Sequence, residues 1–277
     1  MNAQTLKGKL AAVIAVLVCA LMAVSLVGCS SGSSSDSSTG KTKLIVGFDQ
    51  SYPPYGFIGD DGEYTGFDID MAKLTAEKNG WDIELQPIDW DAKDALLDQG
   101  QINCIWNGFT IEGREGKYAF SEPYMINGQV VVVKADSSIK SLSDLAGKVV
   151  ITQAESSTLE LFEGDQKALA DTFGRLDTIS DFNNAFLQLD SGAVDAVACD
   201  LSIAQYQLTA NPTKYVQLSE TLSDENYAVG FKNDENGKEM AAKVTATLKE
   251  LYADGTVKQL CEKYADYGMS IDNWKLK

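Results

Sequence analysis

The chain has 277 residues, of which 44% are hydrophobic, and its 23 basic and 40 acidic side chains give a formal net charge of −17. This length and apolar share suffice for the core of one or two domains, and the acidic excess argues against a nucleic-acid partner, because no basic stripe can neutralise phosphates. The chain has no histidine and its cysteines are widely spaced, so we expect no transition-metal site and no cofactor.

The N-terminus has the pattern of a secretory signal. Lys7 and Lys9 precede an uncharged apolar run over 10–27. The end of this run and the next two residues read Leu-Val-Gly-Cys (26–29), which is similar to the lipobox of bacterial lipoproteins. We therefore predict a lipoprotein signal peptide over 1–28, lipidation of Cys29 and a Ser-rich tether over 29–42. A transmembrane anchor is the alternative reading of the same apolar run. In the lipoprotein reading, membrane attachment comes through Cys29 alone.

From residue 43 onward, short β-rich runs alternate with amphipathic helical runs. This alternation is typical of an α/β protein with mainly parallel sheets. Asp68 is expected to cap the first helix, which ends near residue 80. Strands are predicted over 43–48, 81–88, 102–106, 129–134, 149–152, 175–179, 194–199 and 227–232, and helices over 91–99, 142–146, from 157, 181–189, 239–253 and 256–264.

Two stretches of the chain are nearly alike, LDQGQINCIW (97–106) and LDSGAVDAVA (189–198). In each, a helix is predicted to end at a glycine and an apolar strand to follow at once. Polar residues come directly after both strands, as NGFT (107–110) and CDLS (199–202). Because ligands bind beyond the carboxyl ends of parallel strands, the pattern suggests a cleft between two similar lobes. Reuse of a common glycine turn would explain the repeat equally well.

Several motifs together resemble the polar amino-acid-binding proteins of bacterial ABC importers, which are extracellular solute-binding proteins of family three. The resemblance covers 43–267 in the family's order. It rests on VGFDQSYPPYGF (46–57), GFDIDMAKL (66–74), IDWDA (88–92), NGFTIEGRE (107–115), FSEPY (120–124), SLSDLAGKVV (141–150), GAVDAVACD (192–200) and ADGTVKQLCEKY (253–264).

The resemblance implies a two-lobed periplasmic-binding-protein-like fold (type II) of the α/β class, with two crossover segments. These would lie near 124–129 and 217–227. Lobe 1 is then expected over 43–125 and 225–277, and lobe 2 over 126–224. It also implies an extracytoplasmic protein, lipid-anchored to the cell membrane, that is a monomer and delivers an amino acid to an ABC permease with its ATPase.

By the same resemblance, Arg114 grips the α-carboxylate of a bound amino acid, and the turn at Ser156 and Ser157 completes that carboxylate's shell. A guanidinium suits this role because it can donate two parallel hydrogen bonds. In the family, one more residue commonly separates the threonine from this arginine, and a glycine usually stands where this chain has Glu155. Arg114 must therefore reach the carboxylate from a tighter turn, which Gly113 would permit.

The α-ammonium is expected at Asp200, with the Gly108 carbonyl and the Thr110 hydroxyl as co-acceptors in the loop that begins at Asn107. Taken without the resemblance, an aspartate that follows a strand is more often a helix cap, and Asp200 could cap a helix starting at Leu201.

Specificity is expected from Tyr52 and Trp90 as two aromatic walls and from Asp49 at the side-chain end. Core packing is the ordinary alternative for the two aromatic residues. Two aromatic faces and a carboxylate suit a guanidinium or an ammonium, so we favour arginine or lysine over glutamine, and leave cystine and histidine open. A sensor acting in trans on a membrane partner and a dehydratase-type enzyme are the alternative functions, and without histidine a general base would have to be Glu, Asp, Lys or Tyr.

Overall fold

The computed structural model describes residues 41–277. The predicted signal peptide, Cys29 and all but the last residues of the predicted tether lie outside the described residues. Residues 41–277 contain two larger β-sheets and a small one.

The first sheet has the strand order β5-β1-β6-β14-β7. β1 pairs in parallel with β5 and with β6, and β14 is antiparallel to β6 and β7. The strands are β1 (Lys43–Phe48), β5 (Asp82–Pro87), β6 (Cys104–Ile105), β7 (Tyr118–Phe120) and β14 (Gly230–Lys232).

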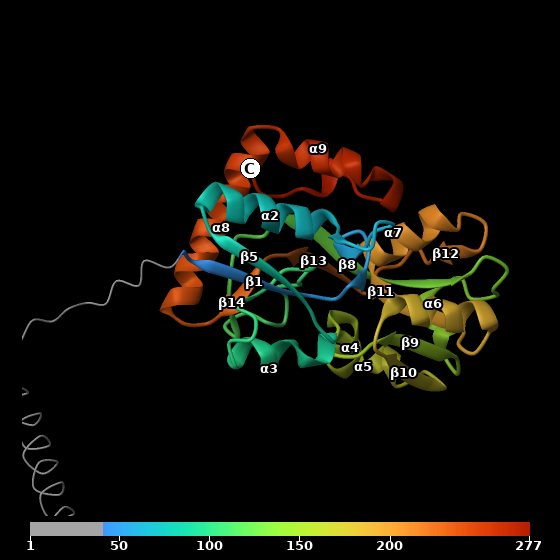
Figure 1. Ribbon diagram of the computed structural model, residues 1–277. Coiled ribbons are helices and arrows are strands. Elements are labelled where there is room, and N and C mark those ends of the chain that lie inside the picture. Colours follow the sequence, from blue (N-terminus) through green and yellow to red (C-terminus); the bar gives the residue numbers. More distant parts are fainter. Residues whose placement is uncertain (1–40) are drawn as a thin grey trace, which may run out of the picture. The chain divides into compact units, whose positions relative to one another are not determined.

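Both faces of the first sheet are covered by helices. Leu44 and Val46 point into a core shared with α2 (Phe67–Asn79) and α8 (Glu235–Ala253). Ile45, between them, packs on the opposite face with residues of α3 (Lys93–Asp98). Figure 1 shows this layering, with α2 and α3 on opposite sides of β1. Consecutive residues of β1 from Leu44 to Val46 are apolar because helices cover both faces of this central strand.

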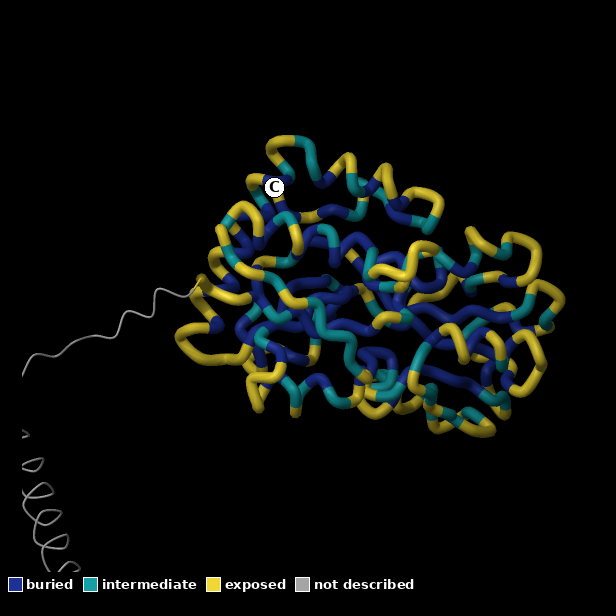
Figure 2. The backbone as a smooth tube through the Cα atoms, viewed as in Figure 1, coloured by how far each residue is buried: buried dark blue, intermediate teal, exposed yellow. Residues whose placement is uncertain are grey.

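The second sheet has the order β10-β9-β11-β8-β12, and β13 also pairs with β8. On one face α6 (Phe182–Ser191) and α7 (Leu201–Ala210) contribute to the core, and on the other α4 (Ser157–Glu163) and α5 (Lys167–Ala170) do so. In Figure 2 the central strands of the sheets, such as β8 and β11, are largely dark blue and the outer turns yellow. The strands are β8 (Met125–Lys134), β9 (Val149–Gln153), β10 (Arg175–Ile179), β11 (Ala196–Asp200), β12 (Tyr215–Gln217) and β13 (Ser223–Tyr227).

Two strands carry the chain between the sheets. β8 leads into the second sheet and β13 leads back, and they pair antiparallel from Met125 with Tyr227 to Gln129 with Ser223. The predicted single strand over 227–232 is therefore wrong. The chain passes from β13 to β14 through Ala228 and Val229, because the two halves of this segment belong to different sheets.

Smaller elements complete the described chain. The third sheet is formed by β2 (Ser51–Tyr52), β3 (Gly56–Ile58) and β4 (Tyr64–Thr65), and α9 (Thr256–Lys263) packs on α2 and α8. Four 3₁₀ turns, over 90–92, 142–145, 265–267 and 271–273, are present in residues 41–277. The helix predicted over 142–146 is thus a 3₁₀ turn, and the one predicted over 91–99 divides into a 3₁₀ turn and α3.

Asp68 does not cap α2, contrary to the sequence expectation. The N-cap is Gly66 at φ 130°, whose carbonyl accepts the N–H of Asp70. Asp68 is instead buried in the first turn, where its Oδ2 accepts the Tyr124 hydroxyl and the Gly108 N–H, both at 2.7 Å. The Asp68 carboxylate is therefore part of a buried hydrogen-bond network with Tyr124 and Gly108 and not a helix cap.

Candidate functional site

A cavity of about 290 Å³ lies at the carboxyl ends of strands from both larger sheets. The segments after β1, β5 and β6 contribute from the first sheet, and the ends of β9 and β11 with the turn after β9 contribute from the second. Nine of the ten predicted binding residues line it, and one further residue, Gln153, joins them. The lining residues are Tyr52, Trp90, Asn107, Gly108, Thr110, Arg114, Gln153, Ser156, Ser157 and Asp200.

Arg114 reaches the cavity from a tight turn. The backbone N–H of Arg114 donates to the carbonyl of Ile111 at 2.9 Å. Gly113, which lies between them, has φ 80°, a backbone conformation that favours glycine. The guanidinium carbon lies 4.8 Å from the centre of the Phe109 ring, and the side chain is only 4% exposed. The shortened turn therefore still brings a buried cation to the cavity wall.

Two cations, Arg114 and Lys93, contact α4 and the turn that precedes it. Arg114 donates from Nε and Nη2 to Oε1 of Glu160 at 3.2 and 3.1 Å. Lys93 donates to the carbonyl of Glu155 at 3.1 Å, and burial, followed by the charge of Arg114, lowers the pKa of Lys93 to about 8. Glu155 has φ 54°, so the non-glycine residue here adopts the left-handed conformation that glycine favours. Positive charge thus gathers beside Ser156.

The turn at Ser156 and Ser157 begins α4. Ser156 is the N-cap, and its Oγ accepts the N–H of Leu159 at 3.1 Å. Ser157 is the first residue of the helix, and its hydroxyl donates to Oε1 of Glu225 at 2.6 Å. Both residues are buried and line the cavity. The same helix, α4, carries Glu160, the ion-pair partner of Arg114.

Asp200 ends β11, and its side chain makes no capping bond to α7. Its Oδ1 accepts hydrogen bonds from Asn127 Nδ2 at 2.9 Å, Gln129 Nε2 at 2.7 Å and the Tyr227 hydroxyl at 2.9 Å. Three donors fix the carboxylate, and its other oxygen, Oδ2, has no hydrogen-bond donor among residues 41–277. The cavity therefore has an anion at Asp200 and a cation at Arg114.

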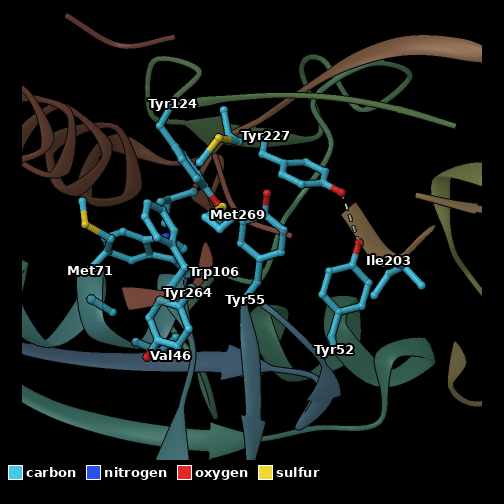
Figure 3. Close-up of a cluster of buried hydrophobic side chains, with 14 of the residues drawn as sticks. Val46, Tyr52, Tyr55, Met71, Trp106, Tyr124, Ile203, Tyr227, Tyr264 and Met269 are labelled. Atoms are coloured by element: carbon cyan, nitrogen blue, oxygen red, sulfur yellow. Dashed lines mark hydrogen bonds between the residues drawn. The ribbon is translucent and has the colours of Figure 1, made fainter. Parts of the chain in front are cut away.

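Tyr52 and Trp90, the two residues predicted as aromatic walls, both line the cavity, and both also pack in the core. The Tyr52 hydroxyl lies 3.1 Å from that of Tyr227, a contact drawn in Figure 3. Trp90 meets the Phe109 ring edge-on at 5.7 Å. Core packing and cavity lining are thus compatible for these aromatic residues, since each belongs to a buried hydrophobic cluster and also lines the cavity.

The position of Gly108 leaves no room for a side chain. It has φ 58°, and a Cβ there would lie 3.0 Å from the Tyr227 ring and 3.1 Å from that of Tyr52. Its N–H donates to the buried Asp68, whose pKa burial raises to about 7. Asn107 precedes it and accepts the N–H of Asp49 at 3.1 Å. Hydrogen bonds with Asp68 and with Asp49 therefore fix the loop after β6.

Asp49 does not line the cavity, unlike the other nine predicted residues. It is 7% exposed, and its two oxygens accept the Ser51 N–H at 2.7 Å and Gln153 Nε2 at 2.8 Å. Burial raises the pKa of Asp49, and the charges of Asp181 and Asp89 add to the effect. Gln153 touches both Asp49 and the cavity.

Sequence reasoning did not find Gln153, Glu225 or Lys93. Gln153 is the last residue of β9, so the rule that ligands lie beyond strand ends could have indicated it. Lys93 and Glu225 carry no such signal, because a charged residue on a predicted helix or crossover is ordinarily exposed. Their burial becomes visible only when the two sheets are brought together.

Comparison with known proteins identifies the family. The family model for bacterial extracellular solute-binding proteins, family 3, matches residues 44–267. The chain belongs to this family. Its members are solute-binding proteins, and the predicted two-lobed fold is confirmed by solved structures of such proteins.

Relatives with different ligands are similar to this chain. The L-cystine-binding protein TcyJ of Escherichia coli (strain K12) is 30% identical over 80% of this chain and 82% of its own length. The arginine-binding extracellular protein ArtP of Bacillus subtilis (strain 168) is 29% identical over 90% of this chain and 95% of its own. An ABC uptake transporter substrate-binding protein from Streptococcus pneumoniae, solved with bound histidine, is 34% identical, with a TM-score of 0.77 over 83% of this chain and 94% of that one.

Two further findings concern residues 41–277. Within them, no helix combines the length and the apolar character needed to cross a membrane. Cys104, Cys199 and Cys261 are buried free thiols.

Proposed function

We propose that this protein is the extracytoplasmic, lipid-anchored substrate-binding component of an amino-acid ABC importer and that it binds a cationic L-amino acid. The observation that carries the proposal is the placement of Arg114 and Asp200 on one cavity, from loops belonging to different sheets. A free amino acid brings a carboxylate and an ammonium on one carbon, and both must be satisfied when water is excluded.

Arg114 and the backbone N–H groups of Ser156 and Ser157 are the proposed carboxylate side of the site. Arg114 Nη1 makes only a long contact of 3.4 Å, to the Thr110 carbonyl, so this nitrogen can turn to a ligand oxygen. Asp200, Thr110 and the Gly108 carbonyl, with Asn107 shaping their loop, are the proposed ammonium side. Each charge-assisted hydrogen bond contributes about 1.5–3 kcal/mol, so these charged residues should dominate affinity for any amino acid.

A cationic side chain is favoured by the charge around Asp49. Asp181 and Asp89 both act on its pKa, and among residues 41–277 no lysine or arginine forms an ion pair with Asp49. A guanidinium or ammonium near Gln153 would offset this negative charge and lie between Tyr52 and Trp90. The arginine-binding relative of Bacillus subtilis is consistent with that choice, while glutamine, cystine and histidine are the ligands against which it must be tested.

The proposed lobes are 43–125 with 225–277, and 126–224, joined by β8 and β13. Ligand groups would then come from both lobes, and closure around the ligand would present a defined surface to an ABC permease with its ATPase. Attachment to the membrane is proposed through the lipid on Cys29, with the protein acting as a monomer.

The test is a binding screen of the L-amino acids on the full-length chain in mild detergent, by thermal shift and then by calorimetry. A ligand at 100 times its dissociation constant stabilises the folded state by about 2.7 kcal/mol, a clear shift. We expect arginine or lysine to give the largest shift and glutamine the next. Shifts only with acidic or aliphatic amino acids would contradict the cationic assignment, and no shift with any amino acid would contradict the receptor role.

A further inference from the structure

Glu225 is a buried carboxylate in the strand that returns from the second sheet to the first. It lies on β13 and is 2% exposed. Its Oε1 accepts the Ser157 hydroxyl at 2.6 Å and that of Ser223 at 3.0 Å. Its Oε2 accepts the Thr110 hydroxyl at 2.9 Å and Gln129 Nε2 at 2.8 Å. One carboxylate therefore bonds to cavity residues that follow strands of both sheets.

These bonds fix the direction of two hydroxyl groups on the cavity wall. An ionised carboxylate only accepts hydrogen bonds, and a hydroxyl has one hydrogen to donate. Thr110 and Ser157 must therefore both give their hydrogens to Glu225. Their remaining lone pairs are left for the cavity, so both hydroxyls act there as acceptors, which suits an ammonium and does not suit a carboxylate.

Glu225 also shares its donors with Asp200. Gln129 Nε2 bonds to Asp200 Oδ1 at 2.7 Å as well as to Glu225, and Asn127 Nδ2 bonds to the two carboxylates at 2.9 and 3.4 Å. Burial and then the charge of Asp200 raise the pKa of Glu225. Among residues 41–277, neither carboxylate forms an ion pair with a lysine or arginine. Two buried anions thus lie side by side with only neutral donors between them.

We propose that Glu225 is a positioning residue for the ligand's α-ammonium, which it serves as a second anion and as the group that turns the Thr110 and Ser157 hydroxyls into acceptors. The inference rests on the proposed function, since it assumes an amino acid with its ammonium at Asp200. A buried pair of carboxylates without a cation is unfavourable, and a bound ammonium relieves it. Glu225 then contributes to the affinity for every α-amino acid without touching the ligand.

The test combines a protein substitution with a ligand substitution. Glu225→Gln keeps the side-chain shape but removes the charge and supplies an NH₂ group, so at least one of the two hydroxyls must turn its hydrogen toward the cavity. Binding is measured by calorimetry for L-arginine and L-glutamine, for their deaminated analogues 5-guanidinopentanoate and glutaramate, and for L-argininamide, in which the carboxylate is neutralised. Asp224→Asn is the matched control, because it removes one charge from the exposed neighbouring residue.

In the wild type, we expect deamination to weaken binding by on the order of 100-fold. Glu225→Gln should bind the amino acids about tenfold more weakly than the wild type does. In this variant, deamination of the ligand should lower the affinity by only about tenfold. The loss on going from arginine to argininamide should be the same in both proteins, and Asp224→Asn should behave as the wild type. A merely structural role for Glu225 would weaken all ligands by one factor and leave both losses unchanged, and that result would overturn the inference.

If the wild type binds no L-amino acid, the proposed function fails, and the inference falls with it. Should Glu225→Gln not fold, Thr110→Val provides the second variant, because it removes one of the oriented hydroxyls while keeping the side chain's size. It should likewise reduce the loss on deamination and leave the argininamide loss unchanged. Equal losses in Thr110→Val and in the wild type would contradict the assigned role of that hydroxyl.

Discussion

Gln153 at the end of β9 donates from Nε2 to Oδ2 of Asp49, the residue after β1 in the other sheet, at 2.8 Å. The same nitrogen donates to the Ser180 carbonyl at 2.8 Å, so the amide orientation is fixed from two sides. Because Gln153 lines the cavity and Asp49 does not, we expect the carboxylate to act on a ligand through its charge and through this amide. The contact also links the two sheets directly.

Asp49→Asn should therefore weaken the binding of cationic amino acids more than that of glutamine. The substitution removes the charge but leaves an oxygen to accept the Ser51 N–H. We expect arginine to lose on the order of tenfold in affinity, because a charge–charge interaction at an effective dielectric constant of about 20 contributes on the order of 1–2 kcal/mol, and glutamine to lose less. Calorimetry on both ligands measures the difference.

Asp60→Asn is the control for that substitution. Asp60 is exposed between β3 and β4 and does not line the cavity, and solvent screens its charge. We expect little change in either affinity. Equal losses for arginine and glutamine in Asp49→Asn would show that Asp49 does not set charge specificity.

Arg114→Ala should weaken every amino acid by a similar factor, on the order of 10- to 100-fold, because all share the α-carboxylate. Its matched control is Arg175→Ala, which removes the other arginine of residues 41–277, an exposed side chain paired with Asp177. Dissociation constants for arginine, lysine and glutamine are compared across the three proteins. A loss confined to one ligand would place Arg114 at the side-chain end instead.

The sequence predicted the strand ends well and the buried polar network poorly. Residues such as Trp90, Thr110 and Asp200 belong to motifs that follow apolar strands, and the local pattern together with the family resemblance placed them on one cavity. Glu225 and Gln153 make their decisive contacts with residues more distant in the chain, such as Thr110 and Asp49. No periodicity encodes such pairs, because they exist only once the sheets meet.

Asp68 illustrates the same limit at a single residue. An aspartate near the start of a helical run predicts a cap from local polarity alone. The N-cap of the helix is instead Gly66, whose φ of 130° suits glycine. The Asp68 carboxylate accepts hydrogen bonds from the Tyr124 hydroxyl and the Gly108 N–H. Local sequence does not distinguish a capping acid from an acid that holds a distant loop.

Ligand binding should close the two proposed lobes about a hinge near 124–129 and 217–227. Contacts such as Arg114 with Glu160 and Gln153 with Asp49 join the two sides, and ligand groups would come from both. We expect the radius of gyration from small-angle scattering to fall when a saturating amino acid is added. Asp200→Ala, which should not bind, serves as the control, and an unchanged radius at confirmed saturation of the wild type would contradict closure.

Cys29→Ala should abolish lipid anchoring, because Cys29 ends the lipobox-like stretch. Multiple acyl chains hold a protein on a membrane firmly, whereas a single chain does so only marginally. Cells making wild type, Cys29→Ala and the control Cys19→Ala are fractionated, and we expect only Cys29→Ala to leave the membrane fraction. Retention of all three would show that the apolar run is an uncleaved anchor.

Asp68 should make the free energy of unfolding fall as pH rises from about 4 to 7. Burial raises its folded-state pKa from 3.8 to about 7, so in this window the folded state holds a proton that the unfolded state has released. The folded state binds more protons there, and stability therefore decreases with rising pH. Asp68→Asn removes this contribution, and the difference in unfolding free energy between variant and wild type should shift by ~1–4 kcal/mol between pH 4 and pH 8. Urea unfolding at several pH values measures it, with Asp60→Asn, at an exposed loop position, as the control. A difference that stays constant with pH would show that Asp68 is ionised at its usual pKa in the fold.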